Sequence, residues 1–400
     1  MAILLLFIFL IGVINFIFQN KKSLSLAFIY STFFLAISTI VITEISSFFK
    51  AYNYSSSIIY WSVLAVTITY LNLKKEFLKI TPYLNWYKEN KKTSLFFGGF
   101  TILLLIQGII YPPNNWDSMT YHMARIAHWV MNESIETYPT HIYRQIYQPP
   151  LSEWIIAQEC ILNKADYFAN AIQLFFLLAT LGVLNQIMLQ FNTSKKTRIL
   201  AGIIAFTTPS VFMQTTSTQN DIVVAFFLLS SILFFIRYFK EATLKNALCI
   251  GVSMGLAILT KGTAFVYLIP IILFSGTYLT YLLLKKHLPF LKVGAQMSFV
   301  TLLTISVGYN HYNRNYKLSG DIFGASDDHY FNKNITLKST GLGLLKKIGN
   351  HLSTPLSSSI TNQVVEKAHL ITKIPINDEN YSYKGIHFKL NQWNHNEDEV

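Results

Sequence analysis

Ten apolar runs separated by polar segments dominate the hydrophobic pattern of this 400-residue chain. A helix that spans the hydrocarbon core of a bilayer needs about 20 mainly apolar residues, within a range of about 17 to 25. Runs near this size lie at 2–18, 24–43, 58–73, 94–111, 167–190, 199–213, 222–238, 246–259, 264–284 and 291–308. The stretch 246–284 is too long for one span and is broken at Lys261-Gly262, so it predicts two helices. The pattern predicts an all-α polytopic membrane protein with about ten transmembrane helices.

Composition supports a membrane location and excludes other classes. Apolar residues make up 52% of the chain and charged residues only 13%, about half the fraction expected of a soluble domain. The net charge of +12 does not indicate a nucleic-acid partner, because the basic residues lie between the apolar runs, where membrane proteins carry them. Cys160 and Cys249 stand in apolar surroundings, so neither a disulfide framework nor a cysteine zinc site is expected. The first run lacks a basic flank and a cleavage site, which predicts a retained helix rather than a signal peptide.

The distribution of Lys and Arg predicts the orientation. With the N-terminus outside, the short inside loops carry 17 Lys and Arg residues and the outside loops carry five. Because cytoplasmic loops carry the excess of positive charge, we expect the segments 112–166 and 309–400 to be extracytoplasmic. We expect the turns 214–221 and 260–263 to be on the same side. The tail has a possible amphipathic stretch at 341–348, and its polar end at 394–399 is consistent with a chain that continues in a longer protein.

The first long outer segment carries the most informative residues. One arc of a helix over 117–130 collects Asp117, Tyr121, Arg125 and His128, whereas its apolar side chains share another arc. This pattern predicts an amphipathic helix in the membrane interface. Asp117 or Ser118 is alternatively only the N-cap of this helix, since both residue types are preferred there. The Tyr, Arg and His beside it keep a catalytic role open for Asp117.

Three further segments have an outer position. Pro149-Pro150 fixes an extended turn, and the apolar residues 151–162 predict a second, short interfacial helix. Asp221 precedes a membrane run, where it acts either as an N-cap or in the site. Lys261 is the only Lys or Arg in the short outside turns between 199 and 308, so it is either a turn lysine at headgroup level or the partner of an anion such as a lipid phosphate. The tail segment 327–329 could bind a divalent cation, although a solvated loop is favoured.

In their order along the chain, these motifs resemble the lipid-linked-sugar glycosyltransferases of the GT-C fold. The closest resemblance is to glycosyltransferase family 39, which includes protein O-mannosyltransferases and the aminoarabinose transferase of lipid A. It rests on Asp117 at the start of the interfacial helix, on Pro149-Pro150-Leu151-Ser152-Glu153-Trp154, on Asp221 and on Leu259-Thr260-Lys261-Gly262. The family often has two adjacent acids where this chain has Asp117 followed by Ser118. The resemblance covers 94–308, with three extra helices in 1–93 before it and the polar tail 309–400 after it.

The resemblance implies a membrane enzyme that transfers a sugar from a polyprenyl-phosphate donor to a hydroxyl of a lipid, glycan or protein acceptor. It implies that Asp117 is the general base of an inverting reaction, and that Lys261 and Arg125 neutralise the donor phosphate. The supporting residues that we expect are Asp221, Tyr121, His122, His128 and Arg144. No metal or other cofactor is expected, and the tail is a candidate for acceptor recognition.

Two other classes stay open. A transporter, a flippase, or a polymerase or ligase of cell-envelope polysaccharides would also be polytopic. A transport path needs polar or charged residues along the helices, and the predicted spans carry few: Gln107, Gln173, Asn185, Gln186 and Gln296. A structural membrane protein would leave the segment 117–154 without a role.

Overall fold

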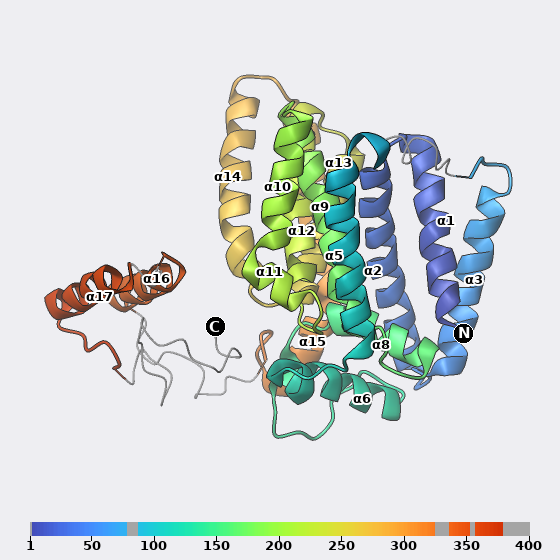
Figure 1. Cartoon of the computed structure of the whole chain (residues 1–400), viewed down its shortest axis with the longest axis horizontal. Coiled ribbons are helices and arrows are strands. Elements are labelled where there is room, and N and C mark those ends of the chain that lie inside the picture. The colour runs from blue at the N-terminus through green and yellow to red at the C-terminus, as the bar shows by residue number, and fades with distance from the viewer. Residues whose placement is uncertain (1, 78–86, 325–335, 353–356, 379–400) are drawn as a thin grey trace. The chain divides into compact units, whose positions relative to one another are not determined.

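The computed structural model describes residues 2–77, 87–324, 336–352 and 357–378 (Figure 1). The chain forms two compact units, residues 1–324 and residues 325–400, and each is described by itself. The described residues form helices and no strands. The predicted all-α class is therefore confirmed.

The apolar runs form the long helices of the first unit. In the described part of the chain, eight helices are long and apolar enough to cross a membrane. They are α1 (Ile3–Lys21), α2 (Leu24–Phe48), α3 (Tyr54–Asn72), α5 (Lys91–Ile110), α9 (Ala171–Gln190), α12 (Asp221–Lys240), α14 (Ala264–Leu284) and α15 (Phe290–Ser319). The chain is thus polytopic, as predicted.

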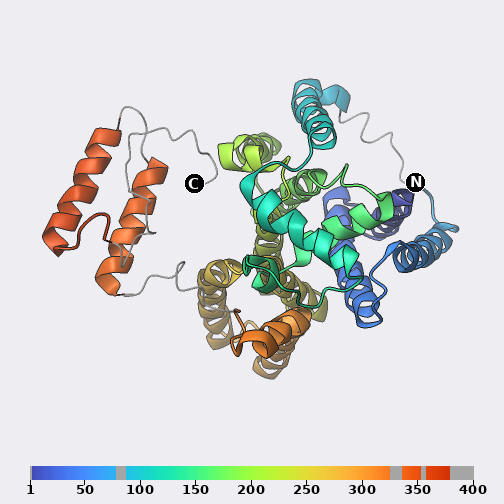
Figure 2. The ribbon, with the colours of Figure 1, turned by 90° about the horizontal axis from the view of Figure 1, so that it is seen from below.

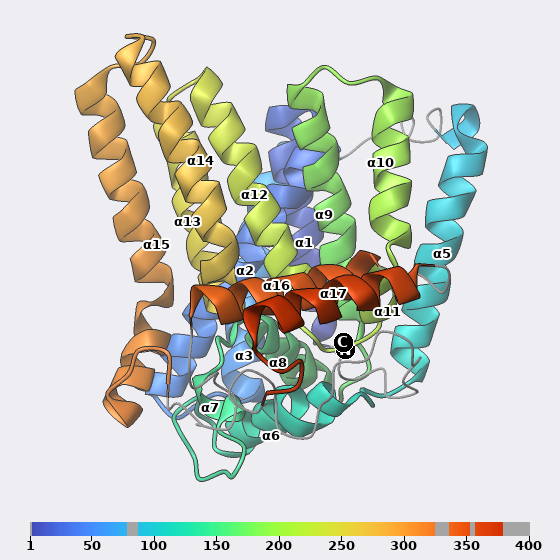
Figure 3. The same ribbon diagram turned by 90° about the vertical axis from the view of Figure 1, so that its left-hand side faces the viewer.

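Two of the ten predicted spans fall short of this length. The run 246–259 becomes α13 (Leu244–Thr260), which has 17 residues. The run 199–213 is divided into α10 (Lys195–Thr207) and α11 (Pro209–Gln214). Pro209 causes the division, because a proline disfavours helical backbone at the residue before it, and Thr208 is accordingly extended. Both α10 and α13 still lie alongside the longer helices (Figure 3).

Close packing around α12 forms the centre of the unit. This helix packs against α9 and α13, and α13 packs against α15. Glycine permits the contact between α13 and α15, because a Cβ added at Gly255 would lie 2.8 Å from the Cβ of Val307 and 3.0 Å from the carbonyl oxygen of Thr304. Small residues allow helix backbones to approach in this way in membrane proteins.

The three N-terminal helices are packed into the same unit. They contact one another and α8 (Leu151–Asn163). The indole of Trp61 on α3 donates a 2.9 Å hydrogen bond to the side chain of Gln158 on α8, and both residues are fully buried. Arg314 on α15 forms two 2.9 Å hydrogen bonds with Glu44 on α2. Helices α1 to α3 therefore pack against the segment 112–166 through α8.

The segment 112–166 folds across one end of this unit. It contains a π-helical turn (Ser118–His122), α6 (Met123–Met131), α7 (Arg144–Tyr147) and α8. Figure 2 views this end and shows α6 and α8 lying across the ends of the longer helices. The alternating directions of the helices bring the turn 215–220, the turn at Lys261-Gly262 and the C-terminal end of α15 to the same end of the unit (Figure 1).

Two expectations about this segment are wrong in part. The predicted polar arc of the first interfacial helix is not a solvated face, because Tyr121 and Arg125 are buried. The predicted second interfacial helix is present as α8, but protein encloses it, and every residue from Leu151 to Glu159 is buried. The reason is the same in both cases. The charged side chains of the two helices pair with each other in the interior.

The second unit contains two described helices that pack against each other, α16 (Leu337–Leu352) and α17 (Ser358–Thr372). The amphipathic stretch predicted at 341–348 lies within α16. The predicted cation-binding alternative at 327–329 and the polar run at 394–399 lie outside the described residues.

Candidate functional site

An ion pair joins the start of α12 to the end of α13. The Lys261 Nζ lies 2.6 Å from the Asp221 Oδ1, with the two side chains 25% and 41% exposed. The Asn220 side chain donates a 3.3 Å hydrogen bond to the Thr260 carbonyl oxygen beside this pair. Asp221 is not the N-cap that the sequence allowed, because the Oε1 of Gln173 accepts a hydrogen bond from the Ile222 amide at 2.9 Å.

Asp117 lies at the start of the π-helical turn and does not cap it either. The Asn115 Oδ1 accepts the hydrogen bond from the Ser118 amide, at 2.7 Å. Asp117 is half-buried and has no hydrogen bond or ion pair within the described part of the chain. Its carboxylate is therefore available to a ligand.

A buried hydrogen bond joins Asp117's turn to the segment before α12. The Thr218 hydroxyl donates to the Ser118 hydroxyl at 2.7 Å, and both residues are fully buried. Ser118 occupies the position where the resembling family often has a second acid. In this chain that position connects two parts of the site instead of adding a charge.

Tyr121 lies among three carboxylates. Burial raises the pKa of its hydroxyl far above the ordinary value, and the negative charges of Asp117, Glu153 and Asp221 raise this pKa further. The hydroxyl is therefore neutral and can donate a hydrogen bond. The Ser118–Thr218 hydrogen bond joins the turn of Asp117 and Tyr121 to the segment before Asp221, so these two acids lie at the same end of the helices.

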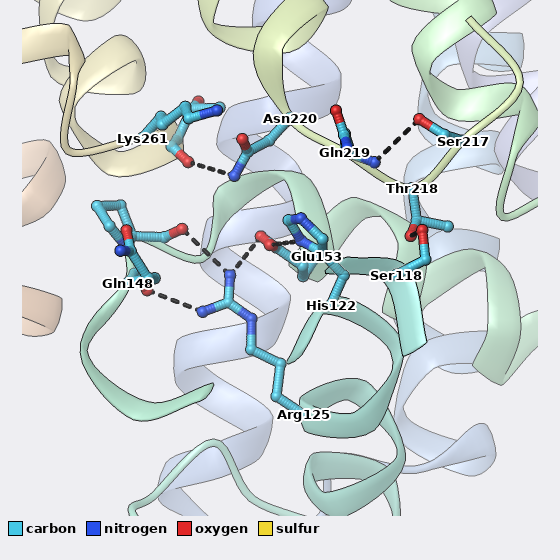
Figure 4. A network of polar contacts seen from close by, with 12 residues as sticks. Ser118, His122, Arg125, Gln148, Glu153, Ser217, Thr218, Gln219, Asn220 and Lys261 are labelled. Atoms are coloured by element: carbon cyan, nitrogen blue, oxygen red, sulfur yellow. Dashed lines mark hydrogen bonds and ion pairs between the residues drawn. The ribbon is translucent and has the colours of Figure 1, made fainter. Parts of the chain in front are cut away.

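Beneath this site, Glu153 joins a fully buried trio with His122 and Arg125 (Figure 4). One carboxylate oxygen binds the Nδ1 of His122, and the other lies 2.5 Å from the Nη2 of Arg125. Burial alone would raise the pKa of Glu153, but the positive charge of Arg125 and the hydrogen bonds with His122 and Arg125 lower it to about 2. The carboxylate is therefore ionised at neutral pH.

Arg125 also holds the Pro-Pro turn in place. Its guanidinium donates hydrogen bonds to the carbonyl oxygens of Gln148, at 2.8 Å, and Pro149, at 3.2 Å. A guanidinium that is buried and already bound to a carboxylate and two carbonyl groups serves the structure of the segment. Its charge is already paired with Glu153, whereas the resemblance implied that Arg125 neutralises the donor phosphate.

The remaining expected residues are His128 and Arg144. The His128 ring is exposed on one side and stacks on Tyr138, with 4.1 Å between the ring centres. Arg144 is half-buried at the first position of α7. The structure thus brings together Asp117, Tyr121, His122, Asp221 and Lys261, and places His128 on a stacking contact of its own.

Sequence reasoning missed Glu153 and Asn220 as site residues. Glu153 stands in the apolar segment 151–162, and burying a carboxylate is costly unless it is paired. An acid in such a segment therefore predicts a buried cationic partner, which is the signal that could have identified it. Among the residues that the structure describes, no group of three or more His, Cys, Asp or Glu side chains could hold a metal ion.

Comparison with known proteins gives one match. The sequence model of the family described as dolichyl-phosphate-mannose-protein mannosyltransferase matches residues 147–307. No curated protein and no solved structure gives a significant match. The matched range runs from the end of α7 into α15 and includes Glu153, Asp221 and Lys261. The predicted resemblance to GT-C glycosyltransferases is confirmed over this range.

Proposed function

We propose that this protein is a membrane glycosyltransferase that moves a sugar from a polyprenyl-phosphate donor to an acceptor hydroxyl. The observation that carries the proposal is the Ser118–Thr218 hydrogen bond, which joins the turn that begins at the unpaired Asp117 carboxylate to the segment before Asp221, the partner of Lys261. The family match over 147–307 supports the same reaction class and the lipid-phosphate donor.

Asp117 is the general base in this proposal. Its carboxylate takes the proton of the acceptor hydroxyl while the hydroxyl oxygen attacks the anomeric carbon of the sugar. The bond between that carbon and the phosphate oxygen breaks, and its electron pair leaves with the polyprenyl phosphate. Attack from the side opposite the phosphate inverts the anomeric centre.

Lys261 stabilises the negative charge on the leaving phosphate. A cation aimed at the oxygen where charge develops is among the largest contributions to catalysis. The Asp221 carboxylate holds the Lys261 Nζ at 2.6 Å and so fixes where the cation lies. The neutral Tyr121 hydroxyl is a second hydrogen-bond donor for the substrate. Arg125 acts at one remove, because it holds Glu153 and the Pro-Pro turn.

We place this site on the extracytoplasmic side of the membrane. The support is the excess of Lys and Arg in the loops at the other end of the helices, 17 against five. A polyprenyl-phosphate donor in the outer leaflet would bring its phosphate to the depth of Lys261.

The test is a transfer assay with purified protein. The protein is incubated with radiolabelled polyprenyl-phosphate sugars and membrane extract, and the labelled product is identified. We expect label to move from a lipid-phosphate donor to an acceptor, with polyprenyl phosphate released. Transfer from a soluble nucleotide sugar, with none from any lipid donor, would contradict the proposal.

A further inference from the structure

Several buried polar atoms lack a hydrogen-bond partner among the described residues. Two of them lie beside the site, the Nε2 of His122 and the Oδ1 of Asn220, on side chains that are 1% and 4% exposed. The other polar atom of each group is bound, since His122 Nδ1 binds Glu153 and the Asn220 amide nitrogen donates to the Thr260 carbonyl oxygen. An unpaired buried polar atom is costly, and a ligand that binds there offsets the cost.

The Glu153 trio decides what kind of group His122 presents. The ionised Glu153 carboxylate can only accept hydrogen bonds, so the Nδ1 of His122 carries a proton and donates it to Glu153. In a neutral imidazole with its proton on Nδ1, the Nε2 has a lone pair and is a hydrogen-bond acceptor.

The two acceptors lie next to the proposed phosphate subsite. The π-helical turn that carries His122 is bound to the segment before α12 by the Ser118–Thr218 hydrogen bond. The His122 ring contacts the Tyr121 ring, with 3.9 Å between the ring centres, and Asn220 directly precedes Asp221, which pairs with Lys261. Figure 4 shows Asn220 and Lys261 on the side of the His122–Glu153 pair opposite Arg125.

We propose that the Nε2 of a neutral His122 and the Oδ1 of Asn220 each accept a hydrogen bond from a hydroxyl group of the donor's sugar, and that Glu153 is the positioning residue that orients His122. The inference rests on the proposed function. Two acceptors need a ligand that donates hydrogen bonds, which a sugar hydroxyl does and a phosphate dianion does not. The site therefore has a sugar-selecting part, His122 with Asn220, beside a phosphate-binding part, Lys261.

Removing one hydroxyl at a time from the donor tests this directly. The probes are bare polyprenyl phosphate, polyprenyl-phosphate mannose and glucose, and the monodeoxy analogues of whichever sugar binds tighter. Binding to purified protein in lipid nanodiscs is measured for the wild type and for His122→Phe, which keeps the ring but has no nitrogen. The matched control is His141→Phe, because His141 is an exposed histidine of the same outer segment.

We expect the analogue that lacks the hydroxyl bound by His122 to bind the wild type and His141→Phe about tenfold more weakly than the parent sugar lipid, as the loss of one buried hydrogen bond implies. In His122→Phe this difference should shrink to less than twofold, while affinity for bare polyprenyl phosphate changes little. If His122→Phe distinguishes the analogues as well as the wild type does, the inference is wrong. If the wild type binds bare polyprenyl phosphate but shows no deoxy pattern, the inference fails and the phosphate subsite stands. If the wild type binds no polyprenyl phosphate at all, the proposed function fails with it.

The role of Glu153 needs a variant that leaves no orphan charge. Glu153→Gln leaves the Arg125 charge unpaired in the interior, and breaking a buried ion pair from one side is strongly destabilising. The double variant Glu153→Leu with Arg125→Met removes both charges and leaves His122 unoriented. We expect it to lose the deoxy pattern while it still binds bare polyprenyl phosphate. A double variant that keeps the pattern would show that Glu153 does not position His122. The His122→Phe result decides the hydroxyl site independently, because it leaves the Glu153–Arg125 pair in place.

Discussion

The Lys261 ammonium and the Asp221 carboxylate lie 2.6 Å apart and fasten the C-terminal end of α13 to the first residue of α12. Both side chains are partly exposed, and an exposed ion pair contributes only about 0–1 kcal/mol to stability. Lys261 is the only Lys or Arg in the short turns 214–221 and 260–263. Its position is better explained by a ligand than by folding.

Lys261→Met should therefore reduce sugar transfer much more than stability. The variant keeps the length of the side chain and removes the cation, so we expect transfer to fall about 100-fold or more. The thermal midpoint should change little. Lys261→Arg should restore only part of the activity, because a planar fork presents its charge differently from an ammonium. Transfer rates and thermal midpoints of the purified variants decide the question.

Asp221→Asn is the companion variant for this prediction. It removes the carboxylate that holds the Lys261 cation in place, so sugar transfer should fall, although by less than in Lys261→Met, which has no cation. If Lys261→Met transfers sugar normally, Lys261 returns to the role of a turn lysine at headgroup level.

Much of the fold could be predicted because membrane helices are encoded locally. Every predicted apolar run lies on a helix or helix pair, since a bilayer requires long apolar helices whatever surrounds them. Pro209 could also have indicated the break between α10 and α11, although the run 199–213 was predicted as one span. The enclosure of α8 could not be predicted, because it depends on helices α1 to α3, which are distant in sequence.

The site could be predicted from the sequence only in part, for a related reason. Asp117, Asp221 and Lys261 stand at the ends of apolar runs, where their position marks them. The sequence left the capping alternatives for both acids open. Asn115 and Gln173 provide the hydrogen bonds instead, and the Gln173 bond joins residues 49 positions apart. Arg125 was expected to face a phosphate, and only the fold reveals Glu153 as its partner.

Glu159 should make stability depend on pH. It is buried near the end of α8, where its Oε1 accepts a hydrogen bond from the Phe168 amide at 3.2 Å. Burial raises the pKa of its carboxyl from 4.5 to about 7. Between these values the folded protein holds a proton that the unfolded chain releases, so the free energy of unfolding falls as pH rises from about 4.5 to about 7 and then levels off.

Glu159→Gln should remove this dependence, because the amide keeps the acceptor for Phe168 and carries no charge. We expect the variant to be more stable than the wild type by about 3 kcal/mol at pH 8 and by no more than about 1 kcal/mol at pH 5. Thermal midpoints in detergent between pH 5 and pH 8 measure this. Glu136→Gln, an exposed glutamate of the same segment, should follow the wild type. Parallel curves for Glu159→Gln and the wild type would contradict the assignment.

The charge distribution predicts which end of the helices faces outward. Ser118 is unsuitable as a reporter because it is buried, whereas Met119 is 61% exposed on the same turn. In a background with both native cysteines replaced by alanine, Met119→Cys and Lys347→Cys should react with a membrane-impermeant thiol reagent in intact cells. Lys196→Cys, on the opposite end of the unit, should react only after the cells are opened. The reverse pattern would invert the topology and place Asp117 on the cytoplasmic side.

Asp117→Asn separates a catalytic carboxylate from a structural one. Asn115 provides the capping hydrogen bond of this turn, and Asp117 has no bond of its own among the described residues, so the variant should unfold at nearly the wild-type temperature. The amide cannot take a proton, and losing a general base lowers turnover by about 100- to 10,000-fold. Sugar transfer, donor binding and thermal stability are measured on the same preparations.

The outcome depends on two companion variants. Asp117→Glu keeps a carboxylate but moves it by one methylene group, so partial activity is expected, because misplacement of a catalytic group costs rate without abolishing it. Asn115→Ala removes the cap and should lower stability by about 0.5–2 kcal/mol while the protein that remains folded still transfers sugar. An Asp117→Asn variant with full activity would show that another group takes the proton. Asp221 would then be the first residue to examine, since its carboxylate lies in the same site and is partly exposed.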